Sequence, residues 1–137
     1  MPMSLLGVCL ALAATPSQAV FVPVQRFTLA WTHSIEKTRW EEEYAVDAHD
    51  GTPRLRALGA RVRGSGAGME PPPDAVLRDG WYEYSSQQSL PSLRLTRSVF
   101  TPDYEWCDAA GCRPLGAWLP SDGGVTLLHA CSDPTPR

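Results

Sequence analysis

The ionisable residues His33 and Glu42 lie in two neighbouring stretches whose other residues alternate as they do in β-strands. The residues of the same parity as His33 are apolar, namely Phe27, Leu29, Trp31 and Ile35. Those of the same parity as Glu42 are Trp40, Tyr44 and Val46. The alternation predicts two strands, with both ionisable groups on the apolar faces. Such a pair either makes an internal hydrogen bond, or forms a small ligand or metal site in which Glu42 orients the imidazole.

The register expected for these strands brings the two groups together. We expect residues 36–39 to connect the strands, which sets Trp31 opposite Tyr44 and His33 opposite Glu42. Directly opposed side chains have their Cβ atoms about 5 Å apart, which is within reach of a hydrogen bond. The pattern therefore predicts a His33–Glu42 pair at the edge of the core.

Catalysis is not what this pair predicts, because no nucleophile faces it. Ser34 follows His33 directly, but adjacent residues of a strand point to opposite faces of the sheet. The two side chains therefore cannot form a Ser–His dyad. We expect a protein that is not an enzyme and that uses no cofactor.

Arginine is dense in one short stretch, where Arg54, Arg56, Arg61 and Arg63 lie within ten residues. The planar guanidinium suits recognition of a carboxylate or of a partner's acidic patch. The alternative is that these side chains solvate the exposed face of a strand. Of the four, Arg61 and Arg63 are the candidates for contact with a ligand or partner.

The segment that follows is rich in glycine and ends in three prolines at residues 71–73. A phosphate-binding glycine loop leads into a helix N-terminus, so this segment does not predict a nucleotide site. Its backbone either forms turns or approaches a ligand or partner closely, ahead of a stiff extended strut. Gly64, Gly66 and Gly68 are therefore candidate contact residues on an exposed loop.

The N-terminal region predicts export. An apolar run over residues 5–14 precedes Ser17 and Ala19, which supply the small-x-small pattern of a cleavage site. The run is too short to span a membrane. We expect a signal peptide over residues 1–19 and one periplasmic or secreted domain over residues 20–137.

Length and charge limit the class of protein further. With 137 residues the chain holds one domain at most. Its formal net charge of -3 argues against general binding of nucleic acid and against strong binding to an anionic membrane.

Cysteine spacing predicts one disulfide. Cys9 leaves with the expected signal peptide, so the mature chain keeps Cys107, Cys112 and Cys131. In an oxidising compartment Cys107 and Cys112 close a small loop, with Cys112 to Cys131 as the rival pairing. One thiol is left over in either case. A zinc site that adds His129 remains as an alternative, but the spacing is looser than in a zinc knuckle, so we expect no metal.

Strand-like runs and turn signals continue along the chain. The expected strands after the first hairpin cover residues 55–62, 81–84, 93–99 and 125–131. A parity break between Leu55 and Leu58 predicts a bulge near Gly59, and Asp79-Gly80 predicts a turn. No stretch after the signal region has helical periodicity. We expect an all-β fold, a small antiparallel sandwich or barrel of about six to eight strands.

Several of these motifs occur in the order of a known bacterial family. The motifs are Trp31-Thr32-His33-Ser34 followed by Glu42, the segment Gly64 to Gly68, and Asp79-Gly80-Trp81. They resemble the family catalogued as domain of unknown function 1850. Its members are often encoded beside tripartite ATP-independent periplasmic (TRAP) transporters of the TAXI type. The resemblance implies an envelope protein that assists solute uptake.

Two functions remain open at this point. The first is a non-enzymatic accessory protein that contacts a TAXI-type solute-binding protein or the membrane subunits of a TRAP transporter. The second is a small periplasmic ligand- or metal-binding module that uses His33 and Glu42, with His129 as a further candidate.

Overall fold

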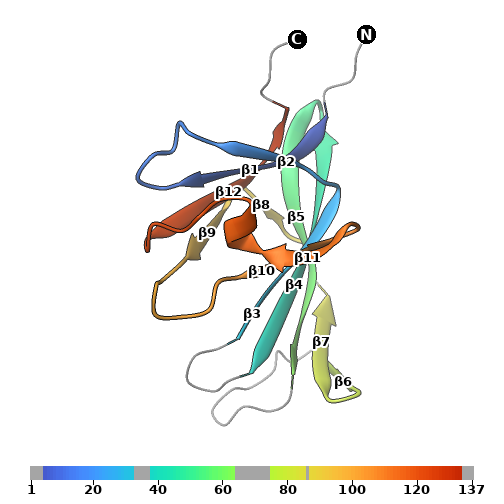
Figure 1. The fold of residues 1–137 in the computed structure, drawn as a ribbon. Helices are drawn as coiled ribbons and strands as arrows, with labels where there is room; N and C mark the ends of the chain where they lie inside the picture. The colour runs from blue at the N-terminus through green and yellow to red at the C-terminus, as the bar shows by residue number, and fades with distance from the viewer. Residues whose placement is uncertain (1–4, 33–37, 64–74, 86, 134–137) are drawn as a thin grey trace.

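The chain folds into two antiparallel β-sheets, drawn in Figure 1 from a computed structural model. The structure describes residues 5–32, 38–63, 75–85 and 87–133. Its strands are β1 (Leu6–Leu12), β2 (Val20–Pro23), β3 (Arg26–Thr32), β4 (Arg39–His49), β5 (Thr52–Arg63), β6 (Val76–Arg78), β7 (Trp81–Ser85), β8 (Ser89–Leu90), β9 (Leu93–Thr96), β10 (Glu105–Asp108), β11 (Gly111–Pro114) and β12 (Val125–Ser132). One 3-10 turn, Leu115–Ala117, is the only helical element of the described residues.

The predicted all-β class is confirmed. The described residues form twelve strands, more than the six to eight expected, because several of them, such as β6 and β8, are very short. Within the described part of the chain, no helix has the length and apolar character that a membrane crossing needs.

The two sheets differ in size. The small sheet has the order β2-β1-β12-β9, and the large sheet has the order β11-β10-β3-β4-β5-β7-β6, with β8 paired to β5. In Figure 1 the long strands β4 and β5 extend past the small sheet toward β6 and β7. Strand β1 contacts β4, and β12 contacts β5, where the sheets pack together. We call the face of the large sheet toward the small one its inner face, and the opposite face its outer face.

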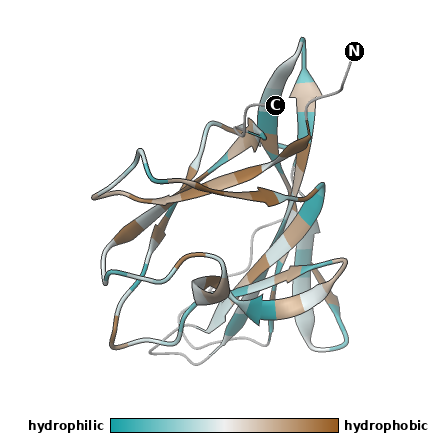
Figure 2. Cartoon of the chain, turned by 45° about the horizontal axis from the view of Figure 1, so that its top comes forward, coloured by the Kyte–Doolittle hydropathy of each residue, from teal (hydrophilic) through white to brown (hydrophobic). Residues whose placement is uncertain are grey.

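The core lies between the two sheets. Trp106 of β10 is fully buried and stacks on Phe27 of β3, with ring centroids 4.4 Å apart. Val8 and Leu10 of β1 join the same apolar cluster from the small sheet. Figure 2 shows the hydrophobic residues gathered along the strands, with hydrophilic residues at several turns. Removal of these side chains from water drives the packing of the two sheets.

The segment predicted to be a signal peptide contains β1, an interior strand of the small sheet. Strand β1 pairs with β2 on one side and with β12 on the other. A disulfide joins Cys9 to Cys131, so the full chain has no unpaired cysteine, and the leftover thiol expected of the cleaved chain stays a prediction. Loss of residues 1–19 would remove both the strand and the disulfide. Cleavage after Ala19 itself stays a prediction.

The hairpin of β3 and β4 has the predicted faces but a different register. Trp31 pairs with Trp40, and Glu42 lies opposite Leu29. The predicted cross-strand pairing of Glu42 with His33 is therefore wrong, and His33 itself lies outside the described residues. The observed register stacks the indoles of Trp31 and Trp40, with centroids 6.1 Å apart and planes within 5°. Alternation alone does not separate registers that keep the same faces.

Two predicted backbone features are confirmed. The register between β4 and β5 shifts next to Gly59, where Leu58 is the extra residue of a bulge. Asp79 and Gly80 have φ values of 51° and 84° and form the tight turn between β6 and β7. The bulge precedes Gly59, which pairs with Glu43 on the outer face.

Candidate functional site

Glu42 lies on the inner face of the large sheet, beside Tyr44 two residues along β4. The phenol of Tyr44 donates a hydrogen bond to Oε1 of Glu42 at 2.7 Å. Burial and the nearby Glu42 carboxylate raise the pKa of Tyr44 far above its ordinary value of 10.0. Burial and Glu42 likewise raise the pKa of Tyr104. The folded protein therefore keeps both phenols neutral around this carboxylate.

Arg61 and Arg63 lie on the outer face, away from Glu42. Successive residues of β5 point to opposite faces, and Val62 between the two arginines is buried on the inner side. Both guanidinium groups lie over the ring of Trp81, at 4.2 and 5.6 Å from its centroid. The structure thus separates the predicted arginines from Glu42 and places them on opposite sides of one sheet.

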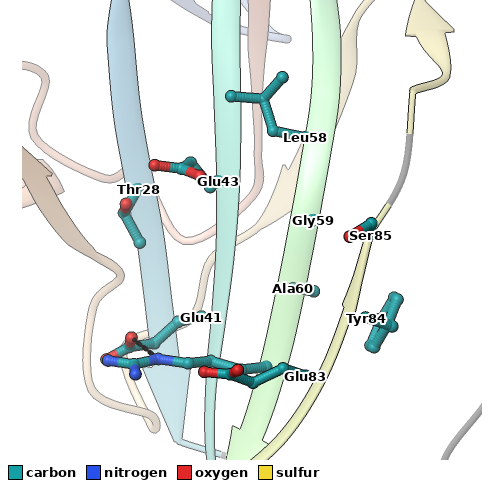
Figure 3. Close-up of a pocket in the computed structure, with 10 residues that line it drawn as sticks. Thr28, Glu41, Glu43, Leu58, Gly59, Ala60, Glu83, Tyr84 and Ser85 are labelled. Carbon is teal, nitrogen blue, oxygen red and sulfur yellow. Dashed lines mark hydrogen bonds and ion pairs between the residues drawn. The ribbon is translucent and has the colours of Figure 1, made fainter. Parts of the chain in front are cut away.

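A shallow groove of 370 Å³ crosses the outer face next to these arginines. Gly59 lines it between Glu43 of β4 and Ser85 of β7, where the backbone of β7 approaches the glycine closely. These two residues are the direct neighbours of Gly59 across the sheet. Figure 3 shows Gly59 between the side chains of the flanking strands. The groove therefore lies where β5 carries the bulge and approaches β7 closely.

An ion-pair network holds charged side chains at one end of the groove. Glu41 accepts hydrogen bonds from Nε of Arg61 at 2.6 Å and from Nε of Arg39 at 2.8 Å. Nη2 of Arg39 continues to Oε1 of Glu105 at 2.6 Å. Burial works to raise the pKa of Glu41, but the hydrogen bonds from Arg39 and Arg61 hold it below its ordinary value of 4.5. The network fixes these charges across β10, β4 and β5.

The lining of the groove is acidic. It holds three glutamates, Glu41, Glu43 and Glu83, against a single arginine, Arg61. Glu43 forms an ion pair of 3.0 Å with Arg26, whereas Glu83 makes a longer contact of 3.8 Å with an exposed arginine. Each glutamate thus already has an arginine partner, so a basic group of another protein would have to share or replace these ion pairs.

The other two arginines of the cluster, Arg54 and Arg56, both pair with the carboxylate of Asp47. Nε of Arg54 and Nε of Arg56 each donate to Asp47 at 2.7 Å. The hydrogen bonds from Arg54 and Arg56 lower the pKa of Asp47, although desolvation opposes them. Arg54 and Arg56 therefore agree with the alternative hypothesis, in which the arginines solvate the exposed face of a strand.

The C-terminal ends of β3 and β5 lie at the same end of the large sheet. His33 follows Thr32, the last residue of β3, and the glycine segment follows Arg63, the last residue of β5. Strands β3 and β5 both run antiparallel to β4, which lies between them, so these strand ends lie at one end. His33, Gly64, Gly66 and Gly68 themselves lie outside the described residues.

The predicted disulfide between Cys107 and Cys112 is confirmed. The two residues are direct partners in the hairpin of β10 and β11. Glu105 lies close to both sulfurs, but cysteines joined in a disulfide cannot ligate a metal as thiolates. The alternative of a zinc site with His129 is therefore wrong, since His129 lies opposite Cys9 and all cysteines of the chain are bonded. Two disulfides indicate an oxidising, extracytoplasmic environment.

Sequence reasoning missed a buried charge in the loop after β9. Arg97 is 4% exposed and forms an ion pair with Asp103. A signal was present, because Arg97 shares the parity of Leu93 and Leu95 and so places a charge in an apolar row. Glu42 likewise is a charged residue among apolar residues of the same parity.

The comparisons with known proteins identify a family and no individual relative. The model described as Domain of unknown function (DUF1850) matches residues 27–115. This span contains the large sheet from Phe27 onward together with β9, whereas β1, β2 and β12 lie outside it. No curated protein and no solved structure gave a match. Because the matched span covers more than half of the chain, the protein belongs to the DUF1850 family.

Proposed function

We propose that this protein is an exported, non-enzymatic accessory protein that assists TRAP-type solute uptake of the TAXI type. The two disulfides support a working place outside the cytoplasm. The association with TAXI-type transporters, which the sequence resemblance implies, supports the choice of partner. That association concerns the transport process, and the geometry of the site suggests which surface makes the contact.

The groove around Gly59 is the observation that carries the proposal. Its charged side chains are already held by ion pairs, in particular Glu41 by Arg39 and Arg61. Groups that are ordered before binding lose little conformational entropy when a partner arrives. An open groove of 370 Å³ on a rigid sheet suits a side chain or short segment of another protein.

The charge of the groove selects the partner surface. Three glutamates line the groove, and we expect lysine or arginine of a TAXI-type solute-binding protein or TRAP subunit to share or replace their arginine partners. Contacts between exposed charges weaken as salt rises, because the Debye length falls to about 8 Å at physiological ionic strength. The association should therefore be sensitive to salt.

A small ligand-binding module is the second candidate, and the position of Glu42 favours it. Its carboxylate lies on the inner face with the phenol of Tyr44 donating to it. Aromatic rings together with a carboxylate suit a small organic cation. The predicted use of His33 belongs to this candidate, whereas His129 does not, because it lies on the small sheet opposite Cys9.

Affinity purification of the tagged full chain from its native envelope tests the proposal. We expect mass spectrometry to find a TAXI-type solute-binding protein or a TRAP subunit with the wild type, and less of it with Glu43→Gln/Glu83→Gln. The control variant Asp50→Asn/Asp122→Asn removes two charges outside the groove and should recover the wild-type amount. A chain recovered alone with a bound small molecule would favour the second candidate. Equal recovery by both double variants would reject the groove as the contact.

A further inference from the structure

The loop between β9 and β10 carries two adjacent apolar side chains that project into solvent. Val99 is 81% exposed and Phe100 is 92% exposed. They are the most exposed large apolar residues of the described chain. In Figure 1 this loop runs outward from β9 before it returns to β10. Single exposed apolar residues are common on protein surfaces. Whether these two form a binding feature therefore depends on how the loop that carries them is held.

A buried ion pair fixes the base of the loop. Arg97 donates from Nε to Oδ1 of Asp103 at 3.1 Å and from Nη2 to Oδ2 at 3.0 Å. Nη1 of Arg97 donates to the carbonyl oxygen of Leu119 at 2.8 Å and to Oγ1 of Thr126 at 3.1 Å. Oδ2 of Asp103 accepts from the backbone N–H of Gly116 at 2.7 Å. Both ends of the loop are thus tied to β12 and to the segment around the 3-10 turn.

One hydrogen bond lies within the tip of the loop. The backbone N–H of Phe100 donates to Oγ of Ser98 at 3.0 Å. A loop whose base is already held loses little backbone freedom on binding. Aromatic residues that enter a desolvated pocket are among the residues that contribute most to protein interfaces.

We propose that Val99 and Phe100 form an anchor that inserts into an apolar pocket of a protein partner. A lipid surface fits less well, because a single myristoyl chain gives only marginal membrane binding and two side chains bury less apolar surface. The net charge of -3 also adds no attraction to anionic lipids. A fixed pair of side chains suits a pocket of matching shape.

The anchor deepens the proposed function and rests on it for the identity of the partner, a TAXI-type solute-binding protein or TRAP subunit. It is distinct from the groove, since the groove lies on the outer face of the large sheet and the anchor follows β9 of the small sheet. Substitutions at the two places therefore test two contacts separately.

Site-specific photo-crosslinking in the native envelope tests the anchor. Benzoylphenylalanine replaces Phe100 in the tagged full chain, and the matched control carries it at Leu77, an apolar residue of β6 that is 59% exposed. We expect a light-dependent adduct with a TRAP-type transport protein from position 100 and not from position 77. With that protein purified, Phe100→Ser should weaken binding about tenfold or more, whereas Leu77→Ser should not. Neither variant should change the melting temperature, because both side chains lie in solvent.

The outcomes separate the anchor from the proposed function. Adducts with lipid alone, or no adduct specific to position 100, would overturn the anchor even if transport proteins still co-purify. An adduct with one identified protein outside the TRAP system, whose affinity falls with Phe100→Ser, would support the anchor and contradict the proposed function.

Discussion

Asp103 neutralises the guanidinium of Arg97, the only charged side chain that is buried among the described residues. Two parallel hydrogen bonds of 3.1 and 3.0 Å join the groups, and the side chain of Arg97 is 2% exposed. Bidentate pairs of this kind combine charge with a defined geometry. The pair therefore links the loop after β9 to the small sheet in one arrangement.

Removing Asp103 should be costly. We expect Asp103→Ala to lower the free energy of unfolding by about 3–5 kcal/mol, because it leaves Arg97 buried without a counter-charge. The double variant Arg97→Met/Asp103→Ala should cost less than Asp103→Ala alone, since it removes the stranded charge as well. Urea unfolding of the three proteins measures both effects. A single variant within about 0.5 kcal/mol of the wild type would show that the pair does not support the fold.

The thiol content of the exported protein reports the fate of β1. A chain that keeps Cys9 has all its cysteines in disulfides, so no thiol should react with iodoacetamide under denaturing, non-reducing conditions. The sequence predicts cleavage after Ala19, but β1 is an interior strand of the small sheet, so from the structure we expect the chain to keep residues 1–19 and to show no reactive thiol. A chain cleaved after Ala19 would instead carry Cys131 as a reactive thiol. Intact mass before and after alkylation distinguishes the two.

Tyr44 should make the free energy of unfolding decrease as the pH rises above about 10. Its pKa is raised in the folded state, so its contribution is complete below the unfolded value near 10.0 and is lost as the pH rises above that value. Tyr44→Phe should cost about 0.5–1.5 kcal/mol at neutral pH through the lost hydrogen bond to Glu42. It should also flatten the decline of the free energy of unfolding above pH 10. Parallel pH profiles for wild type and Tyr44→Phe would contradict this, and Tyr82→Phe is the matched control.

Gly59 should resist even a small side chain. A Cβ at this position would lie 2.7 Å from the carbonyl oxygen of Tyr84, which belongs to the neighbouring strand backbone. We expect Gly59→Ala to lower the free energy of unfolding by about 1–3 kcal/mol through overpacking. Gly124→Ala is the control, because its Cβ would meet the side chain of Asp122 at 3.3 Å. Equal losses in the free energy of unfolding for the two variants would show that the neighbouring backbone tolerates a side chain at Gly59.

Local patterns predicted the faces of residues well. Alternation along β4 placed Glu42 and Tyr44 on one face, because side chains of a strand alternate whatever the strand pairs with. The parity break in β5 located the bulge at Gly59 for the same reason. The bond between Cys107 and Cys112 could be predicted as well, since the two cysteines close one short hairpin.

Contacts across the chain could not be predicted in this way. The register of β3 and β4 follows the stacking of Trp31 on Trp40, and alternation permits several registers with the same faces. Cys9 and Cys131 are 122 residues apart, so no local spacing relates them. The apolar run that contains Cys9 is also as consistent with a buried strand as with a signal peptide.

The groove on the outer face should receive a TRAP-type transport protein. Calorimetric titration of the purified full chain with a TAXI-type solute-binding protein, at low and at physiological salt, tests it most directly. We expect saturable binding that weakens as salt rises and that falls about fivefold with Glu43→Gln/Glu83→Gln, but not with Asp50→Asn/Asp122→Asn. Binding that is indifferent to salt and to both double variants, or no binding at either salt concentration, would contradict the claim.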